Sequence, residues 1–137
     1  MNIFFDVDYT IIGYAGDLRP FVREVFEQIK ADGHTIYLWS GTGIRTEVVE
    51  QHKLHHLVSG CYLKPRWDYH NALPRLGVPM VPDFVVDDHY GIVQAFGGVC
   101  VQRYDGAPYD RDDQEMKRVY QIFCEHTRTM DTPGRNE

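Results

Sequence analysis

The chain has 137 residues, enough for one domain that buries a core without a structural metal or disulfide bonds. Apolar residues make up 43% of the chain and charged residues 25%, as in ordinary soluble globular proteins. The net charge of −6 at pH 7 argues against nucleic acid as a partner, which needs a basic stripe, and gives no reason to expect attraction to anionic membranes. No apolar run approaches the ~20 residues of a membrane-spanning helix.

The beginning of the chain and its cysteines bear on the compartment. The first residues enter an apolar strand directly, without the pattern of a signal peptide. The cysteines, Cys61, Cys100 and Cys124, are odd in number and widely spaced, and the chain has no Cys-x-x-Cys pair. We therefore expect a cytoplasmic protein with reduced thiols and no structural zinc site.

Predicted strands and helices alternate along the chain. A first strand begins at Ile3 and runs into Asp6, and a helix extends from Pro20, which suits the first helical position, to the capping Gly33. The other predicted elements are strands over residues 35–39, 57–63, 84–86 and 99–101, and helices over residues 44–55, 67–76 and 111–126, the last with Asp110 as its N-cap. Alternation of this kind indicates a parallel sheet with right-handed crossovers. We predict a three-layer α/β/α Rossmann-like domain over residues 1–126, with a parallel sheet of about five strands, and a disordered tail over residues 127–137.

Polar side chains follow four of the predicted strands at the points where these strands end. The first strand runs into Asp6-Val7-Asp8-Tyr9-Thr10, and later strands run into Ser40-Gly41, Lys64 and Asp87-Asp88. Because ligands bind beyond the carboxyl ends of the strands in open α/β sheets, we expect these side chains to share one edge of the sheet. Carboxylates held close together repel each other unless a cation or a shared proton separates them.

These motifs, in this order, resemble those of the haloacid dehalogenase superfamily in its phosphatase branch. Asp6-Val7-Asp8-Tyr9-Thr10 is similar to the first motif of that family, Asp-x-Asp-x-Thr. Ser40, Lys64 and Asp87-Asp88 are similar to its second, third and fourth motifs. The resemblance covers Asn2 to about Ile92. It implies an enzyme that hydrolyses a phosphate monoester through an aspartyl-phosphate intermediate, with Mg²⁺ as its cofactor.

The resemblance also implies roles for individual residues. Asp6 would be the nucleophile, and Asp8 would protonate the leaving oxygen and later activate the attacking water. Lys64 would offset negative charge on the phosphoryl group and on Asp6. Ser40 and the backbone N–H groups around Gly41 would donate hydrogen bonds to the phosphate oxygens.

The implied metal site consists of oxygen ligands, which favour Mg²⁺ over softer metals. Asp6, Asp88 and the backbone carbonyl of Asp8 would be the ligands, while Thr10 would brace the loop. Asp87 would act through water or a hydrogen bond, and the roles of Asp87 and Asp88 can also be reversed.

Simpler interpretations exist for each motif taken alone and for the set. Ser40 could cap the following helix, Lys64 could be a solvated charge beside Pro65, and Asp87-Asp88 could form an acidic turn. The whole set could belong to a binding or scaffold protein that kept the fold and lost turnover. A phospho-acceptor signalling domain also uses acidic residues, a hydroxyl and a lysine around Mg²⁺. In response-regulator receivers, however, the acidic pair comes first and the lysine last.

The lengths of the connections bear on access to the site. Residues 11–17 are too few for a cap domain, and residues 65–83 suffice for one helix and its connections. We therefore expect a capless, open site, suited to a phosphorylated macromolecule or to a small substrate enclosed by a neighbouring subunit of a homo-oligomer. Residues 66–70 are a candidate for contacting the substrate beyond its phosphate. The simpler alternative for this segment is the start of an amphipathic helix with Trp67 packed against the domain.

Overall fold

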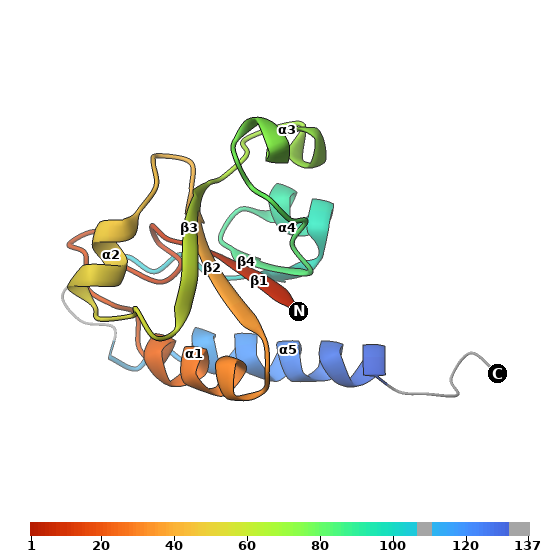
Figure 1. Cartoon of the computed structure of the whole chain (residues 1–137). Helices are drawn as coiled ribbons and strands as arrows, with labels where there is room; N and C mark the ends of the chain where they lie inside the picture. Colours follow the sequence, from red (N-terminus) through yellow and green to blue (C-terminus); the bar gives the residue numbers. More distant parts are fainter. Residues whose placement is uncertain (107–110, 132–137) are drawn as a thin grey trace.

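The computed structural model of the chain describes residues 1–106 and 111–131. In these residues the elements are β1 (Asn2–Asp6), α1 (Val22–Ala31), β2 (Thr35–Ser40), α2 (Thr46–Gln51), β3 (Val58–Leu63), α3 (Tyr69–Arg75), β4 (Phe84–Asp87), α4 (Tyr90–Phe96), β5 (Gly98–Cys100) and α5 (Glu115–Asp131). The strands form one five-stranded sheet in the order β3-β2-β1-β4-β5, and every neighbouring pair is parallel (Figure 1). The predicted fold class, a parallel α/β sheet with a Rossmann-like arrangement, is confirmed.

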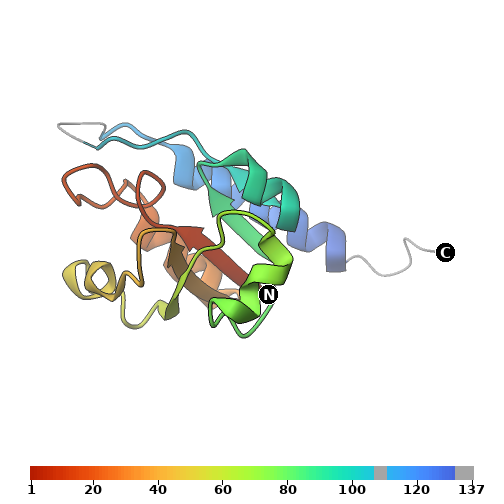
Figure 2. The ribbon, with the colours of Figure 1, turned by 90° about the horizontal axis from the view of Figure 1, so that it is seen from above.

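Helices cover both faces of the sheet, so β1 is buried on both sides. Successive side chains of a strand point to opposite faces, and Phe4 and Phe5 accordingly belong to different apolar clusters. Phe5 packs with Phe26 of α1 in the cluster that also contains Phe123 of α5. Phe4 packs with Trp39 in the cluster completed by side chains of α3 and α4. Figures 1 and 2 show α1 and α5 on one face and α3 and α4 on the other.

The strand order creates a switch point between β1 and β4. From β1 the chain builds outward through β2 to the edge strand β3, and then crosses to the other side of β1 to add β4 and β5. Adjacent crossovers leave in opposite directions at such a point, and in open α/β sheets this is where ligands bind. Asp6 is the last residue of β1 and Asp87 is the last residue of β4, so both carboxylates lie at the switch point.

Several helix boundaries differ from the predictions. The sequence did not predict α4, because this helix has only seven residues, contains Gly91 and buries only Ile92 and Val93, which is too little for a helical repeat. The helix predicted over residues 44–55 is shorter, since Ile44 is exposed and the left-handed conformation of Lys53, with φ 55°, follows its end. Similarly, α1 begins at Val22 rather than at Pro20, and α3 spans Tyr69–Arg75 rather than residues 67–76.

The last helix is longer than predicted at its carboxyl end. It continues to Asp131, so residues 127–131 are helical and not a disordered tail as predicted. Residues 127–130 are not buried, so no apolar repeat marks this last stretch in the sequence. The helix begins at Glu115, and the predicted N-cap Asp110 lies outside the described residues, as do residues 132–137.

The connections between the elements leave the carboxyl edge of the sheet uncovered. In the described parts of the chain, the segment between β3 and β4 holds only α3, and the loop between β1 and α1 holds only turns and isolated bridges. The prediction that the domain has no cap therefore holds for residues 1–106 and 111–131. None of the helices described here combines the length and apolar character that a membrane crossing requires.

Candidate active site

The polar residues predicted from the sequence lie together at the switch point. Asp6 and Ser40 end β1 and β2, Lys64 directly follows β3, and Asp87 ends β4. Pairing of β1 with both β2 and β4 brings these strand ends side by side. The strand before Lys64 does form, although Gly60 accompanies a register shift against β2. A side chain at Gly60 would contact the rings of Tyr37 and Tyr62 at 3.4 Å.

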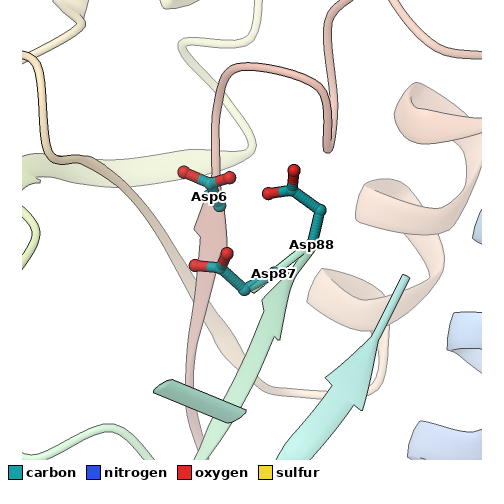
Figure 3. A group of neighbouring side chains, drawn as sticks. All are labelled: Asp6, Asp87 and Asp88. Atoms are coloured by element: carbon teal, nitrogen blue, oxygen red, sulfur yellow. The ribbon is translucent and has the colours of Figure 1, made fainter. Parts of the chain in front are cut away.

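Three carboxylates form the acidic part of the site. Asp6, Asp87 and Asp88 each offer one oxygen atom, and these three atoms lie within 4.8 Å of one another. In Figure 3 the three side chains extend from the ends of β1 and β4 toward a shared space. The side chain of Asp87 is fully buried, that of Asp6 almost so, and Asp88 is partly exposed. Oxygen atoms at this spacing could together hold a metal ion.

Lys64 joins two of these carboxylates. Its Nζ donates to Asp6 Oδ1 and to Asp87 Oδ2, with both distances 3.0 Å, and its side chain is 10% exposed. Lys64 is therefore not a solvated charge beside Pro65, and the simpler interpretation of its motif is wrong. Asp87 also accepts a hydrogen bond from the backbone N–H of His89 at 2.9 Å.

Burial raises the pKa values of two carboxyl groups in the site, and the charge of Lys64 offsets only part of this effect. Burial, together with the charge of Asp87, raises the pKa of Asp6 to about 8, although the ammonium group of Lys64 acts in the opposite direction. Burial also raises the pKa of Asp87, again against the influence of Lys64. For Lys64 itself, burial disfavours the charged form, but the two carboxylates outweigh it and raise its pKa above the ordinary value. The ammonium group of Lys64 thus contacts two of the three carboxyl groups, and a bound cation would balance the remaining negative charge.

Thr10 connects the first loop to the acidic cluster. Its buried hydroxyl group donates to Asp6 Oδ2 at 3.0 Å and lies 3.4 Å from Asp88 Oδ1. The backbone carbonyl of Thr10 accepts a hydrogen bond from Arg19, whose fully buried guanidinium pairs with Asp113 at 2.8 and 2.9 Å. This brace was not found in the sequence, because Arg19 and Asp113 lie 94 residues apart.

Asp8 has a partner that the sequence did not indicate. Arg45 Nη1 donates to Asp8 Oδ2 at 2.5 Å, and its Nε donates to Glu47 Oε2, also at 2.5 Å. Arg45 occupies the N-cap position of α2 and is only 20% exposed at its side chain. The carboxylate of Asp8 therefore leaves the first loop toward α2, where a fixed guanidinium group holds it.

Ser40 is almost fully buried and belongs to the site, not to the following helix. Its Oγ accepts a hydrogen bond from the backbone N–H of Thr42 at 3.2 Å and lies 2.9 Å from Thr42 Oγ1. Because α2 begins only at Thr46, with Arg45 as its N-cap, Ser40 does not cap this helix, and that alternative is wrong. The carbonyl of Gly41 accepts a hydrogen bond from Arg66 Nη2 at 2.7 Å.

A cavity of about 790 Å³ opens over these residues. This volume leaves room for much more than a phosphate group, and both cationic and aromatic side chains border the cavity. Its lining consists of Asp6, Asp8, Tyr9, Ser40, Gly41, Thr42, Lys64, Pro65, Arg66, Tyr69, Asp88, His89, Tyr90, Gly91, Ile92 and Arg103. The guanidinium group of Arg103 lies 3.6 Å from the centre of the Tyr9 ring, so a residue far along the chain also reaches the first motif.

No family model matches this chain, and neither does any curated protein or solved structure. The function therefore has to be inferred from the residues of the site and their geometry.

Proposed function

We propose that this protein is a Mg²⁺-dependent phosphatase of the haloacid dehalogenase type, which hydrolyses a phosphate monoester through an aspartyl-phosphate intermediate on Asp6. The observation that carries this proposal is the position of Asp6. It is a buried carboxylate at the switch point of the sheet, in contact with Lys64 and facing the large cavity. A nucleophile for a phosphate group requires such a position, with cationic neighbours on one side and room for the substrate on the other.

The acidic cluster suits Mg²⁺ by its donor atoms and its charge. Asp6 and Asp88 would hold the ion, and Asp87 would stay attached to Lys64, which already occupies one of its oxygens at 3.0 Å. When bound, Mg²⁺ would offset the negative charges that otherwise keep an anionic nucleophile away from a phosphate.

The chemistry assigned to the side chains has two steps. In the first, a carboxylate oxygen of Asp6 forms a bond to phosphorus while the bond to the leaving oxygen breaks, and Asp8, protonated on the oxygen that does not contact Arg45, donates its proton to the leaving oxygen. In the second, Asp8 takes a proton from a water molecule that attacks phosphorus, and the bond between phosphorus and Asp6 breaks. Inorganic phosphate leaves, and both carboxyl groups return to their starting states. Lys64 and the hydroxyl of Ser40 would stabilise the charge on the transferred group.

Arg45 acts in this scheme as a positioning residue. Asp8 lines the cavity, whereas Arg45 is not among the residues that border it. The hydrogen bond at 2.5 Å between them therefore holds the carboxyl group of Asp8 from a residue outside the cavity lining. A general acid and base has to be held within reach of the oxygen that it protonates, and the ion pair with Arg45 limits the orientations open to Asp8.

The test of the proposed function is turnover of an activated aryl phosphate such as p-nitrophenyl phosphate with Mg²⁺. We expect hydrolysis that excess chelator abolishes, and none by Asp6→Asn, whose circular dichroism should match that of the wild type. Asp112→Asn changes an exposed aspartate outside the cavity and serves as the matched control, with full activity expected. Turnover by Asp6→Asn, or turnover that persists in chelator, would refute the proposal. Release of a single equivalent of p-nitrophenol without further turnover would favour the phospho-acceptor alternative.

A further inference from the structure

A second cavity adjoins the candidate active site on the side of α3. It has a volume of about 290 Å³ and is lined by Gly41, Leu63, Lys64, Pro65, Arg66, Trp67, Ala72, Arg75 and Leu76. We call it the Trp67 groove. Four of these residues, Gly41, Lys64, Pro65 and Arg66, also line the larger cavity over Asp6. The two cavities therefore adjoin each other, and the groove is within reach of a molecule whose phosphate lies at Asp6.

The groove offers mainly apolar surface. Pro65 and Ala72 are buried, Leu63 and Leu76 are partly exposed, and the Trp67 side chain is 73% exposed. The alternative in which Trp67 packs against the domain is thus wrong. Leaving a tryptophan in water forgoes one of the largest apolar gains available to a side chain. An exposed indole beside a catalytic cavity is the kind of surface that a ligand covers.

The turn after β3 holds Trp67 in this exposed place. Asp68 follows it with φ 49°, in the left-handed region that is uncommon for residues other than glycine. Asn71 Nδ2 donates to Asp68 Oδ1 at 2.9 Å, and Arg75 lies 3.6 Å from the other carboxylate oxygen. These contacts from the first and last turns of α3 hold the turn, and with it the backbone at Trp67.

Arg66 marks the boundary between the two cavities. Its Nη2 donates to the carbonyl of Gly41 at 2.7 Å, and a side chain at position 41 would meet its Nε at 3.2 Å. The guanidinium group is therefore held against the loop that follows β2, next to the predicted phosphate-binding residues. A planar guanidinium and an indole ring both stack favourably on flat aromatic groups.

We propose that the Trp67 groove is the subsite for the leaving group and that it selects phosphate monoesters whose leaving group is a flat aromatic or heteroaromatic ring. This inference rests on the proposed phosphatase function, since the phosphate at Asp6 sets where the leaving group begins. The volume of about 290 Å³ lies at the low end of ligand pockets, which suits a ring system better than an extended polymer segment. The apolar lining and the two planar side chains specify the chemistry of that ring.

The kinetic test compares 2-naphthyl phosphate with glycerol phosphate, which has no ring. For Trp67→Ala we expect KM for naphthyl phosphate to rise about three- to tenfold, as for the loss of one aromatic contact, with kcat within about twofold. KM for glycerol phosphate should stay unchanged, and Trp67→Phe should restore most of the loss. Tyr14→Ala removes a ring that is 81% exposed and borders neither cavity, so it is the matched control. An exposed side chain such as Trp67 can be replaced without loss of the fold.

An equilibrium measurement separates this inference from the phosphatase proposal. Calorimetry of the Asp6→Asn protein with Mg²⁺ should show tighter binding of 2-naphthyl phosphate than of methyl phosphate, with the difference lost in a second variant that also carries Trp67→Ala. Equal KM and Kd values in the presence and absence of Trp67 would overturn the subsite, even if the enzyme is a phosphatase. An effect of Trp67→Ala on phosphopeptides but not on naphthyl phosphate would also overturn it and point to a macromolecular substrate. Failure of the wild type to hydrolyse any of these esters would instead refute the proposed function.

Discussion

Replacing Lys64 by methionine removes the cation that the buried carboxylates share. The Lys64 ammonium lies 3.0 Å from an oxygen of Asp6 and 3.0 Å from an oxygen of Asp87, and the three side chains are 10%, 6% and 0% exposed. Removal of one partner from a buried ion pair costs about 3–5 kcal/mol, because the other partner stays buried without compensation. We therefore expect Lys64→Met to lower the free energy of unfolding by about 3–5 kcal/mol in buffer without Mg²⁺ at pH 9.

The size of this loss should depend on pH. Lys64 lowers the pKa of both Asp6 and Asp87, so without it each carboxyl group keeps its proton to a higher pH. At pH 5 the carboxyl groups of the variant can be neutral, and little is lost. As the pH rises, deprotonation of the buried groups becomes more costly in the variant than in the wild type, and the difference grows. The raised pKa of Lys64 keeps its own contribution intact until the pH passes above its ordinary value of 10.5.

Urea unfolding followed by circular dichroism measures this effect at pH 5 and at pH 9. Lys30→Met changes an exposed lysine of α1 and should shift stability by less than about 0.5 kcal/mol. Saturating Mg²⁺ should restore part of the stability of Lys64→Met, since an ion that binds only the folded state stabilises it. A loss below about 1 kcal/mol at pH 9, or an equal loss at both pH values with no response to Mg²⁺, would refute the charge balance inferred for the site.

Three further predictions concern other groups of the site and the thiols. Arg45→Gln should slow hydrolysis of an alkyl phosphate, whose leaving group needs the proton from Asp8, about tenfold or more, and should affect an activated aryl phosphate little. In a protein that already carries Asp8→Asn, we expect no further loss from Arg45→Gln. An equal loss for both substrates would contradict the positioning role. In Mg²⁺-free buffer the wild type should lose stability as the pH rises from about 4 to about 8, by up to about 1.4 kcal/mol per pH unit. The reason is that burial raises the pKa of Asp6 from 3.8 to about 8, so the folded state holds a proton that the unfolded state has lost. A flat stability profile measured by urea unfolding would refute this. Replacing all three cysteines by serine should leave kcat within about twofold, because all three are free thiols and none lines the cavity; a large drop in kcat by a folded variant would assign a thiol to the reaction.

The sequence predicted the fold and the strand ends well because both depend on local pattern. Apolar runs that end in a carboxylate, a serine or a lysine mark parallel strands and their carboxyl edge without any knowledge of distant contacts. Asp6, Ser40, Lys64 and Asp87 lie where this pattern placed them. The choice between Asp87 and Asp88 stayed open in the sequence, and the proposed assignment of Asp88 as the metal ligand uses the contact between Asp87 and Lys64.

The contacts that the sequence could not predict join residues that are far apart or lack a repeating pattern. Arg45 reaches Asp8 across 37 positions and Arg103 stacks on Tyr9, and neither arginine stands in a motif. The exposure of Trp67 depends on a left-handed residue in the following turn, which hydrophobic spacing does not reveal. For the same reason α4 was missed, since a seven-residue helix shows too few buried positions to establish a period.

Identification of the phosphorylated residue tests the central claim most directly. The Asp8→Asn protein is mixed with Mg²⁺ and an activated aryl phosphate, whose leaving group needs no proton, and is quenched in acid. Hydrolysis of the intermediate should then be slow enough for digestion and mass spectrometry to find it. We predict one phosphoryl group on the peptide that contains Asp6, and none in the Asp6→Asn, Asp8→Asn double variant. A phosphoryl group on another residue, or continued turnover with no covalent intermediate, would contradict the account.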